Sequence, residues 1–286
     1  MPETAVRACV VCDRRDRRPE LSLGEWTIER CGGCGLRVLA PEPPDEQLID
    51  VFEDGSIYGG ALDLETELLA RSEASLVALE RLRRPGSLLD VGFGPGFLLE
   101  AARRRGWRST GVDPSPFSVA RARERGLDVH QGLLEDLHLP AGSFDAITLM
   151  QVIEHVVDPH ALLSECMRLL RPGGALVVAT PNPVSLLARV KREGFNYWIP
   201  PVHCVWYTPR ALRRVLRRAG YRPARVTTWS ARTLALHDGL EIVSSSRIGR
   251  ALPYRVRRAA GTALSVAADG LRYGSIVEAI ALKERG

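Results

Sequence analysis

The sequence has almost no lysine and no long apolar segment. Lys191 and Lys283 are its only lysines, so arginine supplies nearly all of the positive charge. No apolar run approaches the roughly 20 residues that a helix needs to cross a bilayer. The first residues are rich in arginine and lack the apolar core of a signal peptide. These absences argue against a membrane-spanning or exported protein, and we expect a cytoplasmic one.

The remaining composition is typical of a globular protein. Hydrophobic residues make up 45% of the chain and charged residues 26%. A length of 286 residues can hold one large α/β domain and a small satellite. The formal net charge of +5 is a mild excess for this length. Such a chain can bind an anionic substrate or RNA, so the charge alone does not choose a partner.

Four of the six cysteines form two C-x-x-C pairs, Cys9 with Cys12 and Cys31 with Cys34. This spacing is typical of a tetrahedral structural Zn²⁺ site. Disulfides are the alternative, but a cytosolic setting disfavours them. We therefore predict a zinc ribbon over residues 1–40, which is too short to bury a core of its own and must be stabilised by the metal.

A glycine-rich stretch follows the first strong strand signal. The apolar run 88–91 predicts a buried parallel strand that enters a turn with Gly92, Gly94 and Gly96, and a helix begins at Phe97. Residues 109–112 predict a second strand, with Asp113 at its carboxyl end. Glycines let the backbone approach a ligand closely, and a carboxylate at this place can accept the hydroxyls of a ribose. The pattern predicts a nucleotide-binding half-fold. A dinucleotide fingerprint would need glycine where the chain has Phe97.

The rest of the chain alternates between predicted helices and strands. A proline-containing helical linker or cap is expected over residues 41–84. Further strands are predicted at 127–130, 143–150, 175–179, 225–229 and 275–282. Residues 236–272 form an arginine-rich helical insertion before the last strand. Its apolar positions can contact a membrane surface or a second subunit, but a helix lying on the sheet is the preferred interpretation.

Several motifs in residues 85–225 carry a family resemblance. The run D-x-G-x-G-x-G, led by Asp90, resembles motif I of the class I S-adenosylmethionine-dependent methyltransferases. The motifs S-F-D-x-I, E-H-V-x-D-P, L-L-R-P-G-G and T-P-N are similar to those of a family that includes ubiquinone-pathway O-methyltransferases and bacterial antibiotic and sugar methyltransferases. The paired C-x-x-C resembles a bacterial subgroup with an N-terminal zinc ribbon. The resemblance implies an α/β, Rossmann-like domain over residues 85–286, with a seven-stranded, mostly parallel sheet whose last strand is antiparallel.

The resemblance also implies a binding site for S-adenosylmethionine. The three glycines would line its methionine portion and sugar, Asp113 would hold the ribose, and Pro114 would flank the adenine. The expected cofactor-binding residues are Tyr58, Asp90, Gly92, Gly94, Gly96, Asp113, Pro114, Leu133, Leu134, Met150 and Gln151. Many relatives carry an acid where this chain has Leu133, which leaves the contact with the adenine amino group open.

The expected chemistry is O-methylation of a small organic acceptor by in-line methyl transfer. A hydroxyl acceptor must lose a proton, and His155 and His203 are the candidate bases. One alternative is an RNA methyltransferase that uses the zinc ribbon for binding, although the chain lacks an N-P-P-Y tetrad. A second is a non-catalytic binding module, which the intact glycine turn disfavours. We expect no nucleic-acid partner, and a monomer or homodimer.

Overall fold

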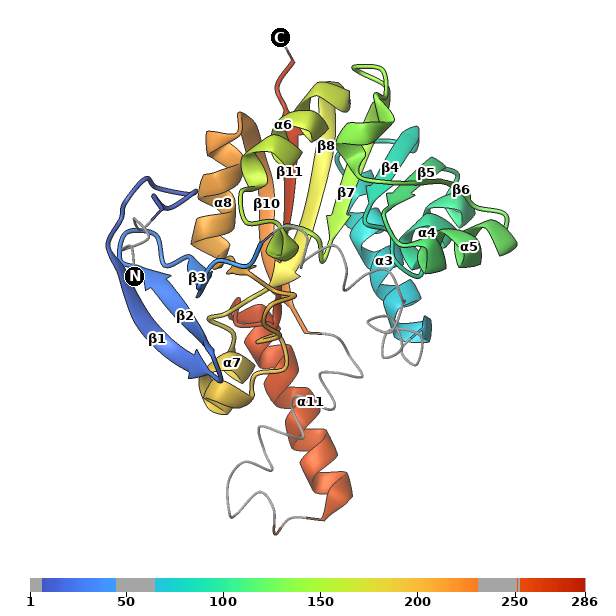
Figure 1. Ribbon diagram of the computed structural model, residues 1–286. Coiled ribbons are helices and arrows are strands. Elements are labelled where there is room, and N and C mark those ends of the chain that lie inside the picture. The colour runs from blue at the N-terminus through green and yellow to red at the C-terminus, as the bar shows by residue number, and fades with distance from the viewer. Residues whose placement is uncertain (1–6, 45–64, 231–250, 252, 286) are drawn as a thin grey trace.

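The computed structural model describes residues 7–44, 65–230, 251 and 253–285 (Figure 1). Two sheets share these residues. The small sheet has the order β1-β2-β3-β9, and the large one has the order β10-β11-β8-β7-β4-β5-β6. The strands are β1 (Arg17–Leu23), β2 (Trp26–Cys31), β3 (Arg37–Ala40), β4 (Ser87–Val91), β5 (Arg108–Asp113), β6 (Asp128–Gln131), β7 (Phe144–Met150), β8 (Leu170–Pro181), β9 (Val205–Trp206), β10 (Tyr221–Trp229) and β11 (Ile276–Lys283). The helices are α3 (Glu65–Glu80), α4 (Phe97–Arg104), α5 (Pro116–Glu124), α6 (Pro159–Leu169), α7 (Leu186–Lys191), α8 (Pro209–Arg218) and α11 (Tyr254–Gly270), with 3₁₀ turns η2 (Leu134–Leu137), η3 (Ile153–His155) and η4 (Arg192–Gly194).

The large sheet has the predicted seven strands. β11 is antiparallel to both of its neighbours, β8 and β10, whereas the pairs from β8 through β6 are parallel. The last strand of the chain therefore inserts in reverse between two earlier ones, which confirms the expected arrangement. Parallel strands bring their carboxyl ends to one edge, and this edge is where open α/β sheets bind ligands.

Both faces of this sheet are covered, which explains its apolar strands. Leu88 of β4 and Val177 of β8 pack with α3 and α4 on one face. Leu89 and Val178, the next residues along the same strands, pack with α6 and α8 on the other face. Successive side chains of a strand point to opposite faces, so each strand needs apolar residues at nearly every position.

Asp145 braces the opposite, amino-terminal edge of the sheet. Its carboxylate accepts hydrogen bonds from the Ser87 amide at 3.0 Å, from Arg83 at 3.1 Å and from Arg171 at 2.6 Å. Two of the motifs that carry the family resemblance, S-F-D-x-I and L-L-R-P-G-G, thus meet in one ion pair. Their role here is to hold strands together rather than to bind a ligand.

The N-terminal ribbon is continuous with the large domain. Strands β1, β2 and β3 form its antiparallel sheet, and Arg17 and Arg18 lie at the start of β1. β9 pairs with β3 through Val38 and Val205, which extends the ribbon's sheet into the second half of the chain. Ile28 and Leu36 of the ribbon share one buried core with Trp206. The ribbon therefore buries its apolar side chains against the domain, and this packing adds to the stabilisation that is expected from the metal.

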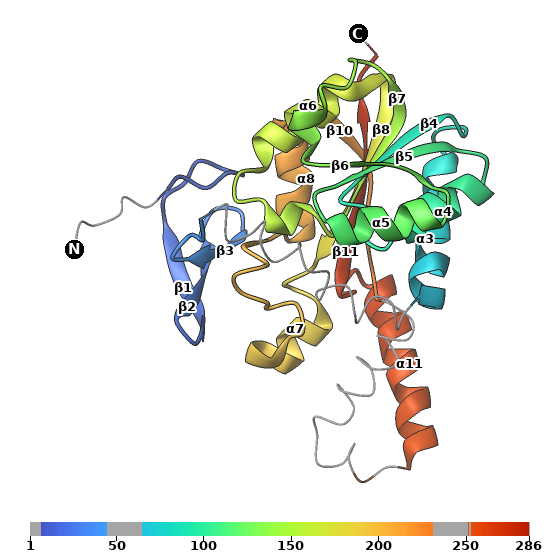
Figure 2. The ribbon, with the colours of Figure 1, turned by 45° about the vertical axis from the view of Figure 1, so that its right-hand side comes forward.

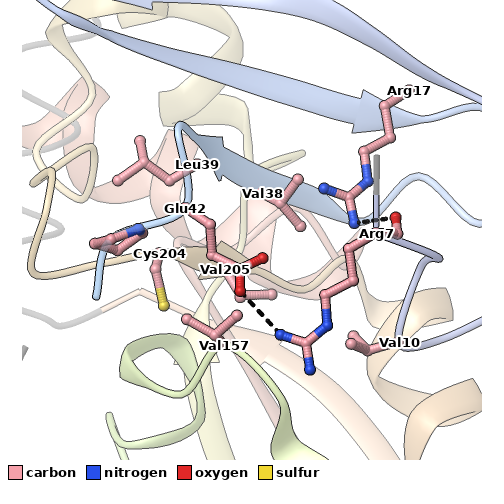
Figure 3. A pocket seen from close by; sticks show the side chains of 10 residues that line it. Arg7, Val10, Arg17, Val38, Leu39, Glu42, Val157, Cys204 and Val205 are labelled. Carbon is pink, nitrogen blue, oxygen red and sulfur yellow. Dashed lines mark hydrogen bonds and ion pairs between the residues drawn. The ribbon is translucent and has the colours of Figure 1, made fainter. Parts of the chain in front are cut away.

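Ion pairs reinforce this attachment at the start of the described chain. The Arg7 guanidinium contacts Glu42 and Asp158, each at 2.9 Å, and Arg17 donates to the Arg7 carbonyl at 2.8 Å. Figure 3 shows Arg7, Arg17 and Glu42 around a small pocket that is also lined by the apolar Val38 and Val205. Arg7 thus joins the ribbon, the linker that follows it and the start of α6.

Helix α11 projects beyond the carboxyl edge of the sheet (Figures 1 and 2). Tyr254, Val256 and Val266 are exposed along it, and Ala268 near its end is buried. The expectation that the insertion lies on the sheet therefore does not hold at these exposed positions of α11, whose described contact with the sheet is with β10. The part of the insertion before residue 251 lies outside the described residues. Among the described helices, none combines the length and apolarity that a membrane span requires.

Candidate functional site

The turn after β4 contains three glycines whose backbone angles are unfavourable for residues with a side chain. Gly92, Gly94 and Gly96 have φ angles of 64°, 49° and 81°, a region that side chains disfavour. The Gly92 amide donates to the Val112 carbonyl at 2.7 Å, and a Cβ on Gly92 would lie 2.6 Å from the Val152 side chain. Helix α4 starts directly after Gly96, so its free amides face the turn. The turn is thus shaped for the close approach of a ligand.

Asp113 fixes this turn from the end of β5. Its buried carboxylate accepts hydrogen bonds from the Gly94 amide at 2.8 Å and from the Ser115 amide at 2.9 Å. Burial raises the pKa of Asp113, and the two amide donors oppose that shift. Each carboxylate oxygen has a further lone pair, so the group can still accept hydroxyl donors. A polar ligand with two hydroxyls, such as a ribose, fits this donor set.

Asp90 is buried inside the sheet, more deeply than a residue that contacts a ligand needs to be. It is fully buried within β4 and accepts a hydrogen bond of 2.5 Å from the Thr148 hydroxyl of β7. Burial raises the pKa of Asp90 to about 7, while the Thr148 hydroxyl lowers it. The structure therefore gives Asp90 a role in joining two central strands, and its contact with a cofactor stays a prediction.

The other predicted cofactor contacts gather at the same carboxyl edge. Pro114 follows β5, and the Gly132 amide donates to the Asp113 carbonyl at 3.1 Å, which ties the loop of Leu133 and Leu134 to that strand end. Met150 ends β7, and Gln151 after it has a φ of 58° and donates its amide to Ala179 of β8 at 2.8 Å. Tyr58 lies outside the described residues.

His155 and His203, which are distant in sequence, meet beside this edge. Their ring centroids are 4.8 Å apart. Nδ1 of His203 lies 2.9 Å from the Tyr197 carbonyl, and Nδ1 of His155 lies 2.7 Å from the Val202 carbonyl. A carbonyl can only accept, so the Nδ1 of each ring carries a proton, and the neutral His203 ring keeps its lone pair on Nε2. Burial lowers the pKa of His155 to about 4 and that of His203 to about 3, so both rings are neutral at pH 7.

Glu154 completes the cluster and was not among the predicted site residues. A carboxylate oxygen of Glu154 and one ring nitrogen from each histidine lie within 4.8 Å of one another. Both oxygens of Glu154 are buried without a hydrogen-bond partner in the described part of the chain, as are the hydroxyls of Thr180 and Tyr207. Burial raises the pKa of Glu154 to about 8. The E-H-V motif was the signal for Glu154, but only the fold shows that the side chain points inward.

Replacing Glu154 by glutamine should stabilise the protein more as the pH rises. The carboxyl group ionises near 4.5 in the unfolded chain but near 8 when folded, so the wild type loses stability between these values, whereas glutamine does not titrate. The advantage of Glu154→Gln in free energy of unfolding should grow by at least about 1 kcal/mol from about pH 5 to about pH 8. Urea denaturation at both pH values measures this, with exposed Glu135→Gln as the control. An advantage that is equal at both pH values would contradict the buried, protonated state.

The four N-terminal cysteines have the geometry of a zinc site. The sulfurs of Cys9 and Cys34 lie 3.6 Å apart and those of Cys12 and Cys31 lie 3.5 Å apart, and all four fall within 4.8 Å of one another. A tetrahedral Zn²⁺ with Zn–S bonds of about 2.3 Å places its sulfurs about 3.8 Å apart. Disulfide bonds need about 2.05 Å, so these distances match ligands of one ion rather than bonded pairs.

Known proteins match most of the large domain. A family model described as a methyltransferase domain matches residues 65–226. A ubiquinone biosynthesis O-methyltransferase from Cereibacter sphaeroides is 38% identical over 148 residues, which are 48% of this chain and 60% of that protein. The chain thus spans about three fifths of the length of this curated relative.

Solved structures share the fold over a longer stretch. The [4+2]-cyclase SpnF has a TM-score of 0.52 at 26% identity, covering 75% of this chain and 81% of its own. A methyltransferase from Archaeoglobus fulgidus that depends on S-adenosylmethionine has a TM-score of 0.55 at 20% identity, covering 79% of this chain and all of its own.

The family match covers more than half of the chain, and it includes the glycine turn, Asp113, the parallel strands β4 to β8 and the first part of β10. The chain therefore belongs to the methyltransferase domain family, in its class I form that depends on S-adenosylmethionine.

Proposed function

We propose that this protein transfers a methyl group from S-adenosylmethionine to a hydroxyl of a small organic acceptor, with a quinone-like phenol as the first candidate. The observation that carries the proposal is the glycine turn held by Asp113 at the carboxyl edge of the sheet. Support for the acceptor class comes from the curated relatives, whose names place them in ubiquinone biosynthesis.

The donor side of the site consists of the turn and the strand ends around it. Gly92, Gly94 and Gly96 would receive the methionine portion, and Asp113 would accept the ribose hydroxyls. Met150 and Gln151, which end β7, would border the sulfur. When bound, the donor supplies an activated methyl group on a sulfonium. The chain therefore needs to align the acceptor, exclude water and remove one proton.

His203 is the residue that we propose to remove that proton. Its Nδ1–H is held by the Tyr197 carbonyl, which leaves the Nε2 lone pair as the basic position. It is neutral at pH 7 because burial lowers its pKa. His155, whose ring packs edge-on against His203, would position it.

Replacing His203 by asparagine should lower kcat about 100-fold without weakening donor binding, because general bases contribute about this much to proton transfer. Because the neutral ring is the active form, wild-type kcat should stay level as the pH falls through 6.5, where an ordinary histidine titrates, and decline only toward the lowered pKa of about 3. Exposed His138→Asn is the matched control. A kcat that survives His203→Asn would assign the base elsewhere.

The direct test is turnover. The purified zinc-loaded chain is incubated with S-adenosylmethionine and a panel of catechols, quinols and sugars, and mass spectrometry searches for products heavier by one CH₂ group. S-adenosylhomocysteine should form only with an accepted substrate. If the chain binds no S-adenosylmethionine at all, the proposed function is wrong.

A further inference from the structure

A cleft of about 680 Å³ lies between the zinc ribbon and the segment that follows β8. One wall is the second knuckle of the ribbon, with Gly33 and Cys34. The other wall includes Pro183 and Val184, which follow the carboxyl end of β8, and residues of α7 and η4. Figure 1 shows α7 at this edge, beside the tip of the β1–β2 hairpin. The volume is in the range of small-molecule sites, which run to about 1,000 Å³.

Arginine is the most frequent residue type in the lining of the cleft. Arg30 and Arg37 come from the ribbon, and Arg189, Arg192 and Arg210 come from the large domain. Glu20 and Glu193 are the acidic residues of the lining, and Glu20 already pairs with Arg37 at 2.7 Å. Within the described ranges, Arg30, Arg192 and Arg210 have no acidic side chain at ion-pair distance. Three guanidinium groups from two parts of the chain thus line one space, and none of them forms an ion pair with a carboxylate of the described residues.

The backbone at Arg192 is held in an unfavourable conformation. Its φ of 49° and ψ of −113° are rare for a residue with a side chain, and such strain costs about 1–3 kcal/mol. The Trp198 indole donates to the Arg192 carbonyl at 2.9 Å, which holds this geometry. Strained backbone that neighbours hold in place is common at ligand sites.

The same loop connects the cleft with the proposed base. Trp198 lines the cleft and packs edge-on against Trp206, with ring centroids 4.9 Å apart. The carbonyl of Tyr197, the preceding residue, accepts from both Trp206 and His203. A molecule anchored on the arginines would therefore lie against the loop that orients His203.

We infer that this cleft binds a phosphate or diphosphate ester carried by the methyl acceptor, with Arg30, Arg192 and Arg210 as its anion ligands. Guanidinium groups bind phosphate oxygens in pairs, which suits a non-reacting anchor that fixes the reacting hydroxyl. Binding energy from such a remote group aligns the acceptor for transfer. The inference rests on the proposed function for the identity of the anchored molecule, and it makes the zinc ribbon one wall of the acceptor site.

Titration calorimetry of the zinc-loaded full chain with inorganic pyrophosphate, and in parallel with inorganic phosphate, tests the site. The variant is Arg192→Gln combined with Arg210→Gln. The matched control is Arg214→Gln combined with Arg217→Gln, which removes the same charge from exposed positions of α8 that do not line the cleft. We expect saturable 1:1 binding of pyrophosphate to the wild type, at least about tenfold weaker binding to the cleft variant and unchanged binding to the control.

The outcomes separate this inference from the proposed function. S-adenosylmethionine should bind equally to the wild type and to both variants, so its loss would count against the function and not against the anion site. Absence of saturable pyrophosphate binding would overturn the inference. Equal weakening in the control would overturn it as well, because the effect would then come from overall charge. Tighter binding of an RNA oligomer, weakened equally in both variants, would overturn it in favour of an extended polyanion surface.

Discussion

Replacing Asp113 by asparagine is expected to weaken the binding of S-adenosylmethionine by 100-fold or more. The carboxylate accepts from the Gly94 and Ser115 amides and would also accept the ribose hydroxyls. An amide group of the same size presents an NH₂ to one of these donors, so one buried N–H loses its partner and the glycine turn shifts. Hydrogen bonds to charged groups contribute about 1.5–3 kcal/mol each. Losing one bond from a backbone amide and one from a ribose hydroxyl therefore weakens donor binding by 100-fold or more.

The measurement is calorimetric titration of donor into each variant, with circular dichroism to verify folding. Asp128→Asn is the control, because Asp128 begins the neighbouring strand β6 and its exposed carboxylate accepts a hydrogen bond from Thr110, at 2.8 Å, and not from the glycine turn. The control should bind the donor like the wild type. Unchanged affinity in Asp113→Asn would remove the central contact of the proposed site.

Removing the zinc is expected to destabilise the whole chain and not the ribbon alone. Structural zinc sites contribute about 10–16 kcal/mol of apparent binding free energy, and this becomes folding free energy where the ligands are otherwise unconstrained. The sulfurs of Cys9 and Cys31 share a core with Trp206 and with the α8 side chains that cover the large sheet. Loss of the ion would therefore expose apolar surface of the main domain.

Metal analysis of the purified chain should find one zinc per molecule, and Cys31→Ser should lose it. The melting temperature of Cys31→Ser should fall by well over 10 °C, because about 1 kcal/mol shifts the midpoint of a chain this long by about 2–4 °C. Cys166→Ala is the control, since Cys166 is a buried core cysteine away from the site. A Cys31→Ser protein that melts like the control would show that the sulfurs hold no structural ion.

Local patterns sufficed to predict the central sheet. Its central strands β4, β7 and β8 are largely apolar, and β4 is followed by the glycine turn, so these strands could be recognised from local sequence. β1 and β9 could not be predicted from the sequence, because their pairing with neighbouring strands, and not their composition, makes them strands. Arg17 and Arg18 look like loop residues until β2 pairs with them, and Val205 and Trp206 form a strand only because β3 lies alongside. α11 lies within the predicted helical insertion, but its placement could not be predicted, because periodicity shows that a helix is amphipathic and not what it contacts.

The two halves of the site differ in the same way. The donor side lies in one continuous stretch of sequence, in which the turn and Asp113 are only about twenty residues apart. The spacing therefore predicts a nucleotide-binding site there, and the family resemblance adds S-adenosylmethionine as its ligand. His155 and His203 could each be named as a candidate base, but nothing in the sequence indicates that their rings meet or that Glu154 is buried beside them. The arginine cleft needs the ribbon to fold back onto η4, a contact between distant segments that no local pattern carries.

The pairing of β3 with β9 means that the ribbon is not a detachable module. Val205 and Trp206 follow His203 almost directly, so the strand that the ribbon completes is also the support of the loop beside the proposed base. Removal of the first forty residues would leave the edge of β9 unpaired and would uncover the Trp206 indole beside the proposed base. The ribbon and the loop that carries the proposed base are therefore physically coupled, and we expect substitutions in one to be tolerated only when the other can accommodate them.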